Sequence, residues 1–375
     1  MGRFRAPAVG MDIDRGAIKA VQVSSGGGDY TLQHVGYRRL PAGVIADGEV
    51  ADHDLLASEI GEFWSTHGFK GKSVILGLSN RKVVVRLLDF PRMDPEDLDS
   101  AIGYEAQDHI PMPVDEAVLD HMVLGPQEEG SDMDRILIVA ARKDMVARFT
   151  SAVRSAGIRP AGVDVKALAL MRSTLPETLF DEGATLLLDV GTEITNLVVC
   201  QGGSPTLTRF IVGGSNQFAQ TIAEVAGIEE EDAEKHLMNP NIRIGQDPDA
   251  DEFAVEDSEE EENEKSGEDL DPSLMFDIRR GLEDSVQVMA EDVQRSVEYH
   301  YSQPGAKEVS RVFVSGDGAL VDGLDSYVGE LLGISAQRAN PLQKLAANRS
   351  NVSDEQLRVM EPVLAIALGL AIEEA

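Results

Sequence analysis

The sequence predicts an α/β fold built from two similar halves. The first observation is a short pattern that occurs twice, as DIDRGAIK at residues 12–19 and as DVGTEITN at residues 189–196. Each copy ends one apolar β-type run and leads into another, which is typical of a β-hairpin with a carboxylate at the end of its first strand. The second observation is that each half continues through three strands into a helix. The chain of 375 residues is long enough for two or three domains.

Composition excludes several classes of protein. A hydrophobic content of 42% is typical of a globular chain. The net charge of −33 argues against nucleic acid or an anionic membrane surface as a direct partner, although a basic peptide remains compatible with it. The single cysteine, Cys200, lies in an apolar run and is expected to be a small core residue. Without an apolar leader or a run long enough to span a bilayer, we expect a cytoplasmic protein.

In the first half, apolar and β-branched runs predict strands over residues 9–13, 17–23, 30–38, 73–78, 83–88 and 135–140. Helical spacing of apolar residues predicts helices over 52–67, 95–107 and 143–156. Asp94 and Pro95 suit the start of the second helix, and Gly157 suits the end of the third. Trp64 falls on the apolar face of the first helix and is expected in the core.

The second half repeats this order. Strands are predicted over residues 185–190, 196–200, 207–211 and 311–315, and helices over 214–226, 232–238, 273–301, 323–332 and 362–372. Residues 247–271 are crowded with Asp and Glu, and they contain few apolar anchors. We expect this segment to be a mobile surface loop, because like charges repel one another.

The two hairpins are the candidate site. Asp12 and Asp189 lie at the ends of apolar strands, where a carboxylate is costly unless something satisfies it. Each carboxylate alone is compatible with a simple cap of its own turn. Two copies that face one cleft favour a shared Mg²⁺ ion held largely through water, with Asp12 and Asp189 as its protein ligands.

Further residues of the two hairpins suit a polyphosphate. Lys19 lies across the first hairpin from Asp12, where its ammonium is a point charge for phosphate oxygens. Gly16, Gly191, Thr192 and Thr195 offer backbone N–H groups and hydroxyl donors. A third small-residue turn follows a strand near the C-terminus and could accommodate a flat base against its backbone; it consists of Gly316, Asp317, Gly318 and Ala319.

Several longer segments resemble one family. They are residues 40–50 (LPAGVIADGEV), 101–111 (AIGYEAQDHIP), 139–143 (VAARK), 189–197 and 365–370. On these segments and the paired hairpins the chain resembles the actin-like ATP-binding superfamily, and within it the PilM family of type IV pilus assembly proteins, relatives of the division protein FtsA. The resemblance implies an actin-like (ribonuclease-H-like) duplicated fold, with two lobes and a small subdomain inserted in the first.

The resemblance also implies ATP and Mg²⁺ between the lobes, with Glu234 in the region that meets the ribose. The chain departs from the family pattern at three positions. Asp14 stands where the family usually has Gly, Arg15 stands where it has a small hydroxyl residue, and Lys166 stands where it often has Glu. A protonated lysine cannot act as the base that orients water, so we predict bound ATP with slow or absent turnover.

From the resemblance we assign the following segments: residues 1–73 to the first lobe, 74–159 to the inserted subdomain, 160–183 to the first lobe again, 184–226 to the core of the second lobe, 227–308 to its outer subdomain, 309–350 to its core, and 351–375 to a C-terminal helix that returns to the first lobe.

The resemblance implies an adaptor that binds the cytoplasmic N-terminal peptide of an inner-membrane PilN-like protein and links it to the pilus motor ATPases. The peptide groove is expected between the inserted subdomain and the first lobe, and the protein at the membrane only through that partner. The alternatives are an active ATPase, a small-molecule kinase, or an FtsA-like filament. The sequence leaves homo-oligomer formation open.

Overall fold

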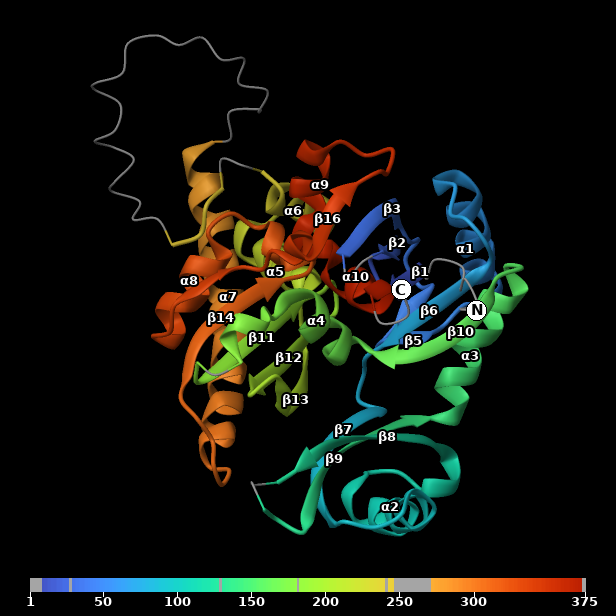
Figure 1. Ribbon diagram of the computed structural model, residues 1–375. Coiled ribbons are helices and arrows are strands. Elements are labelled where there is room, and N and C mark those ends of the chain that lie inside the picture. Colours follow the sequence, from blue (N-terminus) through green and yellow to red (C-terminus); the bar gives the residue numbers. More distant parts are fainter. Residues whose placement is uncertain are drawn as a thin grey trace.

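The computed structural model describes residues 9–26, 29–127, 130–180, 182–239, 242–245 and 271–372. In this part of the chain two β-sheets form the centres of two lobes, and a smaller third sheet lies at the bottom of the molecule in the view of Figure 1. The predicted α/β class with two lobes is confirmed. The predicted acidic loop, residues 247–271, lies outside the described residues except for Asp271.

The sheet of the first lobe has six strands among the described residues. Across the sheet they are β10 (Arg159–Val165), β6 (Ser73–Leu78), β1 (Val9–Ile13), β2 (Ala17–Gly26), β3 (Asp29–Arg39) and β16 (Leu345–Asn348). β1, β2 and β3 form an antiparallel meander, whereas β1 pairs with β6 and β6 with β10 in parallel. The parallel strands therefore end at the same edge of the sheet as the turn between β1 and β2.

Helices cover both faces of this sheet. Gly36 of β3 lies against Phe63 and His67 of α1 (His53–His67), which packs beside α3 (Lys143–Ser155). Gly10 of β1 lies on the opposite face, against α10 (Ala365–Ile372). α1 begins at Asp52, whose side chain accepts the Leu55 N–H, and it ends at Gly68 with a φ of 69°. Trp64 is buried on α1, as predicted.

α10 is apolar along its whole length and all of its residues are buried. A helix that is apolar on every side belongs inside a protein, between two layers. α10 packs on β1, β2 and α4 (Lys166–Thr174) at very short range. A Cβ atom on Gly10 would lie 2.1 Å from the Ala367 carbonyl oxygen, and one on Gly369 would lie 1.8 Å from the Ala169 carbonyl oxygen. Glycine is therefore required at both positions.

The sheet of the second lobe has five strands in the described part of the chain. Across the sheet they are β13 (Ser204–Val212), β12 (Ile194–Gln201), β11 (Ala184–Val190), β14 (Val309–Ser315) and β15 (Ala336–Arg338). One face forms a core with α5 (Ser215–Ala226), α6 (Glu230–Leu237), α7 (Pro272–Tyr301) and α8 (Leu324–Leu332). The other face, which includes Leu187 and the buried Cys200, joins the core of the first lobe through α4. Cys200 is thus a core residue, as predicted.

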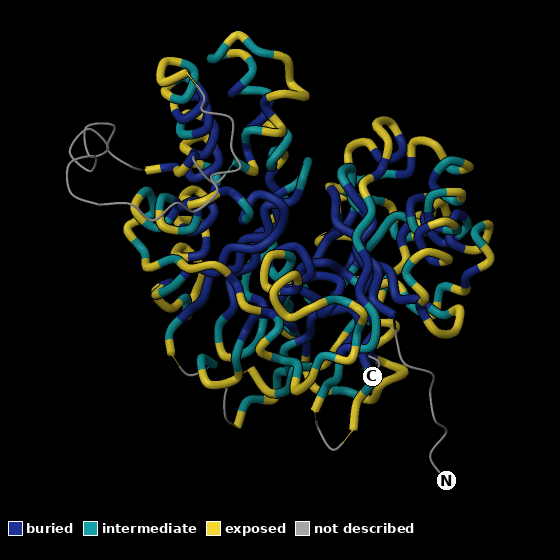
Figure 2. Tube along the Cα trace, turned by 90° about the horizontal axis from the view of Figure 1, so that it is seen from above, coloured by how far each residue is buried: buried dark blue, intermediate teal, exposed yellow. Residues whose placement is uncertain are grey.

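The two lobes are continuous in their interior. Seen from above, the buried residues of both lobes meet at the centre of the molecule (Figure 2). α4 and α10 lie at this junction, because α4 contacts β11 and β12 of the second sheet as well as α10.

The third sheet consists of β7 (Val83–Pro91), β9 (Met133–Arg142) and β8 (Ala117–Pro126), with β9 in the middle. α2 (Pro95–His109) covers one face through Leu98, Ile102 and Ala106. β8 and β7 are edge strands of this sheet, since each pairs with β9 on one side only.

Sheet pairing places some segments differently from the predicted boundaries. The predicted subdomain 74–159 includes β6 and α3, yet β6 is paired inside the first sheet and α3 packs on α1. The small sheet with α2 spans residues 83–142. β16 pairs with β3, so the chain has returned to the first lobe before residue 351. It continues through α9 (Asp354–Met360) into α10.

Candidate functional site

The turns of the two predicted hairpins face each other between the lobes. A Cβ atom on Gly16 would lie only 2.3 Å from Thr192 Oγ1, so the first turn is in direct contact with the second. The Arg15 guanidinium lies 3.9 Å from Glu193 Oε1 across the same junction. A small cavity of about 30 Å³ remains, lined by both turns together with Ser79, Lys166 and Asn196. The prediction that the hairpins face one cleft is confirmed, and that cleft is narrow.

Asp12 and Asp189 occupy equivalent positions in the two sheets. Asp12 of β1 pairs with Lys19 of β2 in the strand register, and Asp189 of β11 pairs with Asn196 of β12. Both aspartates are buried. The duplication seen in the sequence is thus a duplication of structure, in which Lys19 and Asn196 correspond to each other.

Lys19 joins the two lobes. Its Nζ atom lies 2.8 Å from Asp14 Oδ2 in its own hairpin and 2.8 Å from Asp317 Oδ2 in the second lobe. The side chain is only 2% exposed. Burial alone would lower the pKa of Lys19, but the charges of Asp14, Asp317 and Asp12 raise it well above its ordinary value. Lys19 is therefore a charged group enclosed by carboxylates.

The Asp14 carboxylate is held by its own turn. Its Oδ1 atom accepts hydrogen bonds from the Gly16 N–H at 2.8 Å and the Ala17 N–H at 2.9 Å. Burial would raise the pKa of Asp14, whereas Lys19 and Lys166 lower it, and the result is a pKa below the ordinary value. Asp14 is thus an ionised side chain that occupies the backbone donors of the first turn.

Lys166 lies at the start of α4 and forms the second buried ion pair. Its Nζ atom is 2.5 Å from Asp12 Oδ1 and donates to the Ile13 carbonyl oxygen at 2.9 Å. Both side chains are almost fully buried. Asp12, a predicted metal ligand, therefore already has a cation beside it.

Asp189 is held by neutral partners. Asn196 Nδ2 donates to its Oδ2 atom at 3.1 Å, and Ser315 Oγ donates to its Oδ1 atom at 3.1 Å. Ser79 of the first lobe in turn donates to Asn196 Oδ1, the side-chain amide oxygen. Burial, with a smaller effect of the Asp12 charge, raises the pKa of Asp189 to about 6.

The raised pKa of Asp189 predicts a pH dependence of stability. Its folded-state pKa of about 6 exceeds the ordinary value of 3.8. The contribution of protonated Asp189 to the free energy of unfolding is therefore fully present below pH 3.8 and is lost as pH rises through about 6. Groups facing it are Asp12, Lys19, Lys166, Asn196 and Ser315. Asp189→Asn should therefore unfold at the same urea concentration as the parent near pH 4, and be more stable by up to about 3 kcal/mol near pH 8. Urea unfolding across this pH range measures the difference. A constant difference between the two proteins would contradict the raised pKa.

A larger cavity of about 280 Å³ adjoins the turns on the side of α6. Glu234 lines it, as the resemblance predicts, together with Arg15, Gly16, Thr192 and Asp317. The remaining lining residues were not predicted as site residues, although Leu40 and Ala42 lie in the family-like segment 40–50; they are Tyr37, Arg39, Leu40, Ala42, Ser215, Asn216, Leu237 and Met238. They come from the end of β3, the start of α5 and the end of α6, and the closeness of these elements is a property of the folded chain.

Several predicted site residues lie elsewhere. Thr195 is fully buried and donates to the Gly213 carbonyl oxygen inside the second lobe. Gly316 and Gly318 pack against Val190, since a Cβ atom on either would come within 2.5 Å of it. Ala319 is buried in the core of the second lobe. Of the turn predicted to hold a base, only Asp317 lines the larger cavity.

The space directly between the turns is too small for a triphosphate, although the adjoining cavity of about 280 Å³ has room for a larger ligand. A cavity of about 30 Å³ has room for one or two water molecules. Among the described residues no group of three or more His, Cys, Asp or Glu side chains is placed to hold a metal ion. Of the two predicted metal ligands, Asp189 accepts hydrogen bonds from Asn196 and Ser315. Asp12 forms an ion pair with Lys166, although its buried Oδ1 atom accepts no hydrogen bond among the described residues.

Comparison with known proteins identifies the family and the fold of this chain. The family model described as type IV pilus assembly protein PilM matches residues 10–246 and 250–375. The structure of a PilM–PilN type IV pilus biogenesis complex contains a chain that is 27% identical; the match covers 98% of each chain, with a TM-score of 0.80.

Two more distant structures share the fold. Ethanolamine utilization protein EutJ from Carboxydothermus hydrogenoformans is 14% identical, with 97% of this chain and 88% of that chain covered and a TM-score of 0.55. MreB 5 of Spiroplasma citri, solved bound to AMPPNP, is 13% identical, with 100% and 97% covered and a TM-score of 0.56. These likenesses are consistent with the predicted actin-like fold.

Proposed function

Since the chain belongs to the family of type IV pilus assembly protein PilM, we propose that it is an adaptor that holds a peptide of a PilN-like inner-membrane protein. The proposal is supported by the relative solved as a PilM–PilN complex. No helix in the described part of the chain is long and apolar enough to cross a membrane. The protein would therefore reach the membrane through this partner, as the resemblance predicts.

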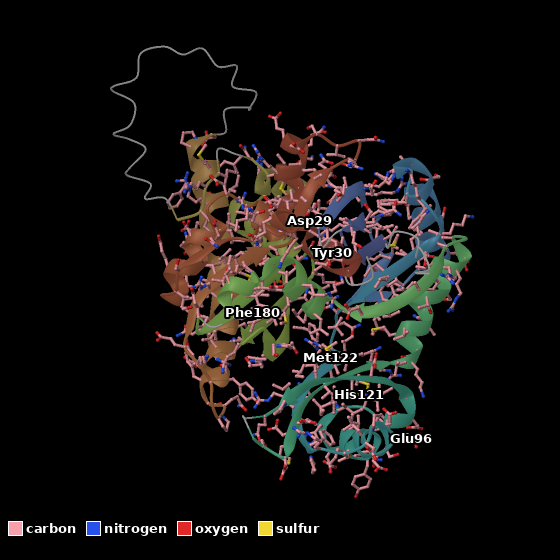
Figure 3. All side chains as sticks on the ribbon, viewed as in Figure 1. Asp29, Tyr30, Glu96, His121, Met122 and Phe180 are labelled. Carbon is pink, nitrogen blue, oxygen red and sulfur yellow. The ribbon has the colours of Figure 1, made fainter. Side chains whose placement is uncertain are left out.

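A groove between the small sheet and the first lobe is the candidate peptide site, in the region predicted from the resemblance. Its volume is about 180 Å³. One wall is formed by β8 and β9, and the other by β10 and α4. Figure 3 shows Met122 on the side of the small sheet that faces the rest of the molecule, and His121 toward α2. His121 Nδ1 lies 3.6 Å from Asp99 of α2, in agreement with this alternation.

The groove is mostly apolar and open, although Asp120, Asp164 and Arg172 also line it. Met122 is 57% exposed, and Val118 and Val163 are exposed as well. Leu137, Val139 and Leu168 form the floor between them. Exposed apolar side chains that gather in one groove mark an interaction site more often than an ordinary surface. An apolar segment of a partner would bury them.

β8 offers a second means of binding. It pairs with β9 along one side, so the backbone N–H and C=O groups along its other side are not paired with a strand of this sheet. An extended peptide can add to such an edge as a further strand, with its alternate side chains in the apolar groove. The net charge of −33 favours a peptide whose flanking residues are basic.

Replacing Met122 with Glu should weaken binding of a synthetic peptide, corresponding to the cytoplasmic N-terminus of the partner, by at least about tenfold. A carboxylate in the groove would lose its water against apolar side chains. Fluorescence anisotropy of the labelled peptide measures the change. Val359→Glu is the matched control, because Val359 is 68% exposed on α9, at the opposite end of the molecule (Figure 1). Equal affinity of the two variants would refute the groove as the site.

The adaptor function proposed here requires no nucleotide chemistry. ATP and Mg²⁺ come to this chain from the resemblance and from the nucleotide-bound MreB 5, and they remain a prediction. The alternatives of an active ATPase, a small-molecule kinase or an FtsA-like filament are not favoured by the family. Contacts with pilus motor ATPases and homo-oligomer formation likewise remain predictions.

A further inference from the structure

The first turn between the lobes already holds an anion. Consecutive backbone N–H groups in a turn form a concave site for a phosphate or carboxylate oxygen. In this chain the Gly16 and Ala17 N–H groups both donate to Asp14 Oδ1. The other oxygen of the same carboxylate lies 2.8 Å from the Lys19 ammonium. Asp14 therefore occupies both backbone N–H donors and one ammonium donor of Lys19, which are groups that an entering phosphate would need.

A second donor of Lys19 is also taken up. An ammonium group has three donors, and a second donor of Lys19 reaches Asp317 Oδ2 at 2.8 Å. Thr192 Oγ1 donates to the same Asp317 oxygen at 3.2 Å. An anion entering here would have to displace one carboxylate and meet the other at short range, which is strongly unfavourable in a buried site.

The position beside Asp12 already holds a cation. Lys166 Nζ lies 2.5 Å from Asp12 Oδ1, and it is fixed by a hydrogen bond to the Ile13 carbonyl oxygen. A divalent ion at Asp12 would have to displace this ammonium. The side chain has little room to move away, because Lys166 is nearly fully buried and its Cγ atom lies next to Gly77.

We propose that this interlobe site is ligated by its own side chains, with the Asp14 carboxylate in the place of a phosphate and the Lys166 ammonium in the place of a metal ion. The Lys19–Asp317 pair then links the lobes without a nucleotide. Two features carry the proposal together: the turn donors occupied by Asp14 and the Lys166 ammonium beside Asp12. It is independent of the proposed adaptor function, which uses a different surface.

The test is a titration of the full chain with a fluorescent ATP analogue and Mg²⁺, combined with thermal unfolding. We expect no saturable binding up to about 1 mM, and a melting temperature that Mg²⁺–ATP leaves unchanged. Saturable one-to-one binding that unlabelled ATP competes away would overturn the proposal.

A double variant tests the two side chains directly. Asp14→Gly with Lys166→Ala frees the turn donors, Lys19 and Asp12, so we expect analogue binding at least about tenfold tighter than that of the parent. Asp232→Ala with Lys235→Ala removes an exposed pair on α6 and is the matched control. If the folded double variant binds no better than this control, Asp14 and Lys166 are not the groups that occupy the site.

Should the double variant fail to fold, Asp14→Asn replaces it. The amide oxygen of Asn can still accept the Gly16 and Ala17 N–H groups, but it removes the charge opposite Lys19. We expect a measurable increase in analogue binding over the parent, and an unchanged titration would overturn the assignment of Asp14. Neither arm uses the partner peptide, so either result leaves the groove assignment to be judged separately.

Discussion

Replacing Lys19 with Met is expected to lower the free energy of unfolding by about 3–5 kcal/mol. Methionine fills a similar volume but leaves Asp14 and Asp317 buried without the cation that lies 2.8 Å from both. Removing one partner of a buried ion pair exposes the full cost of desolvating the other. Urea unfolding followed by circular dichroism measures the loss.

Two further variants show whether this loss comes from unpaired charge. Lys235→Met removes a lysine of similar chemistry from an exposed pair with Asp232, and it should leave the unfolding curve unchanged. Adding Asp317→Leu to Lys19→Met should restore part of the stability, because it removes one of the two stranded carboxylates. A double variant that is no more stable than Lys19→Met alone would argue that lost packing, and not charge, explains the effect.

The paired hairpins could be predicted from the sequence because their signals are local. Each motif places an aspartate, a turn and a second strand within eight residues, and these strands formed as predicted. The missed strands include β8, β10, β15 and β16, and β8 lacks a clean period of two. β10 contains Pro160 and Gly162, and its register is irregular between them. Such edge strands are set by neighbours that a single sequence does not reveal.

The contacts that decide the chemistry of the site are not local. Lys19 and Asp317 are 298 residues apart, and Lys166 reaches Ile13 across 153 residues. The sequence marked Asp14 and Lys166 as unusual, but it could not show that each is partnered inside the site. Likewise, Gly316 and Gly318 looked like backbone open to a ligand, yet in the fold they permit close packing on Val190. A glycine-rich turn alone cannot distinguish these two uses.

Gly369→Ala is expected to destabilise the protein by about 3 kcal/mol or more, the upper end of what overpacking costs. A Cβ atom at this position would lie 1.8 Å from the Ala169 carbonyl oxygen and 2.4 Å from its carbonyl carbon. Both are backbone atoms of α4, so no side chain can rotate away to make room. α10 would have to move off α4 at the junction between the lobes.

Gly61→Ala on α1 is the matched control for this change. Nothing lies within 4 Å of a Cβ atom at Gly61, so the same substitution in a helix should there raise stability by up to about 1 kcal/mol. The two variants share the change in helix propensity and differ in the space available. Opposite shifts of the melting temperature would show that contact between α10 and α4 fixes the lobes. A stabilised Gly369→Ala protein would mean that these helices are not in contact as described.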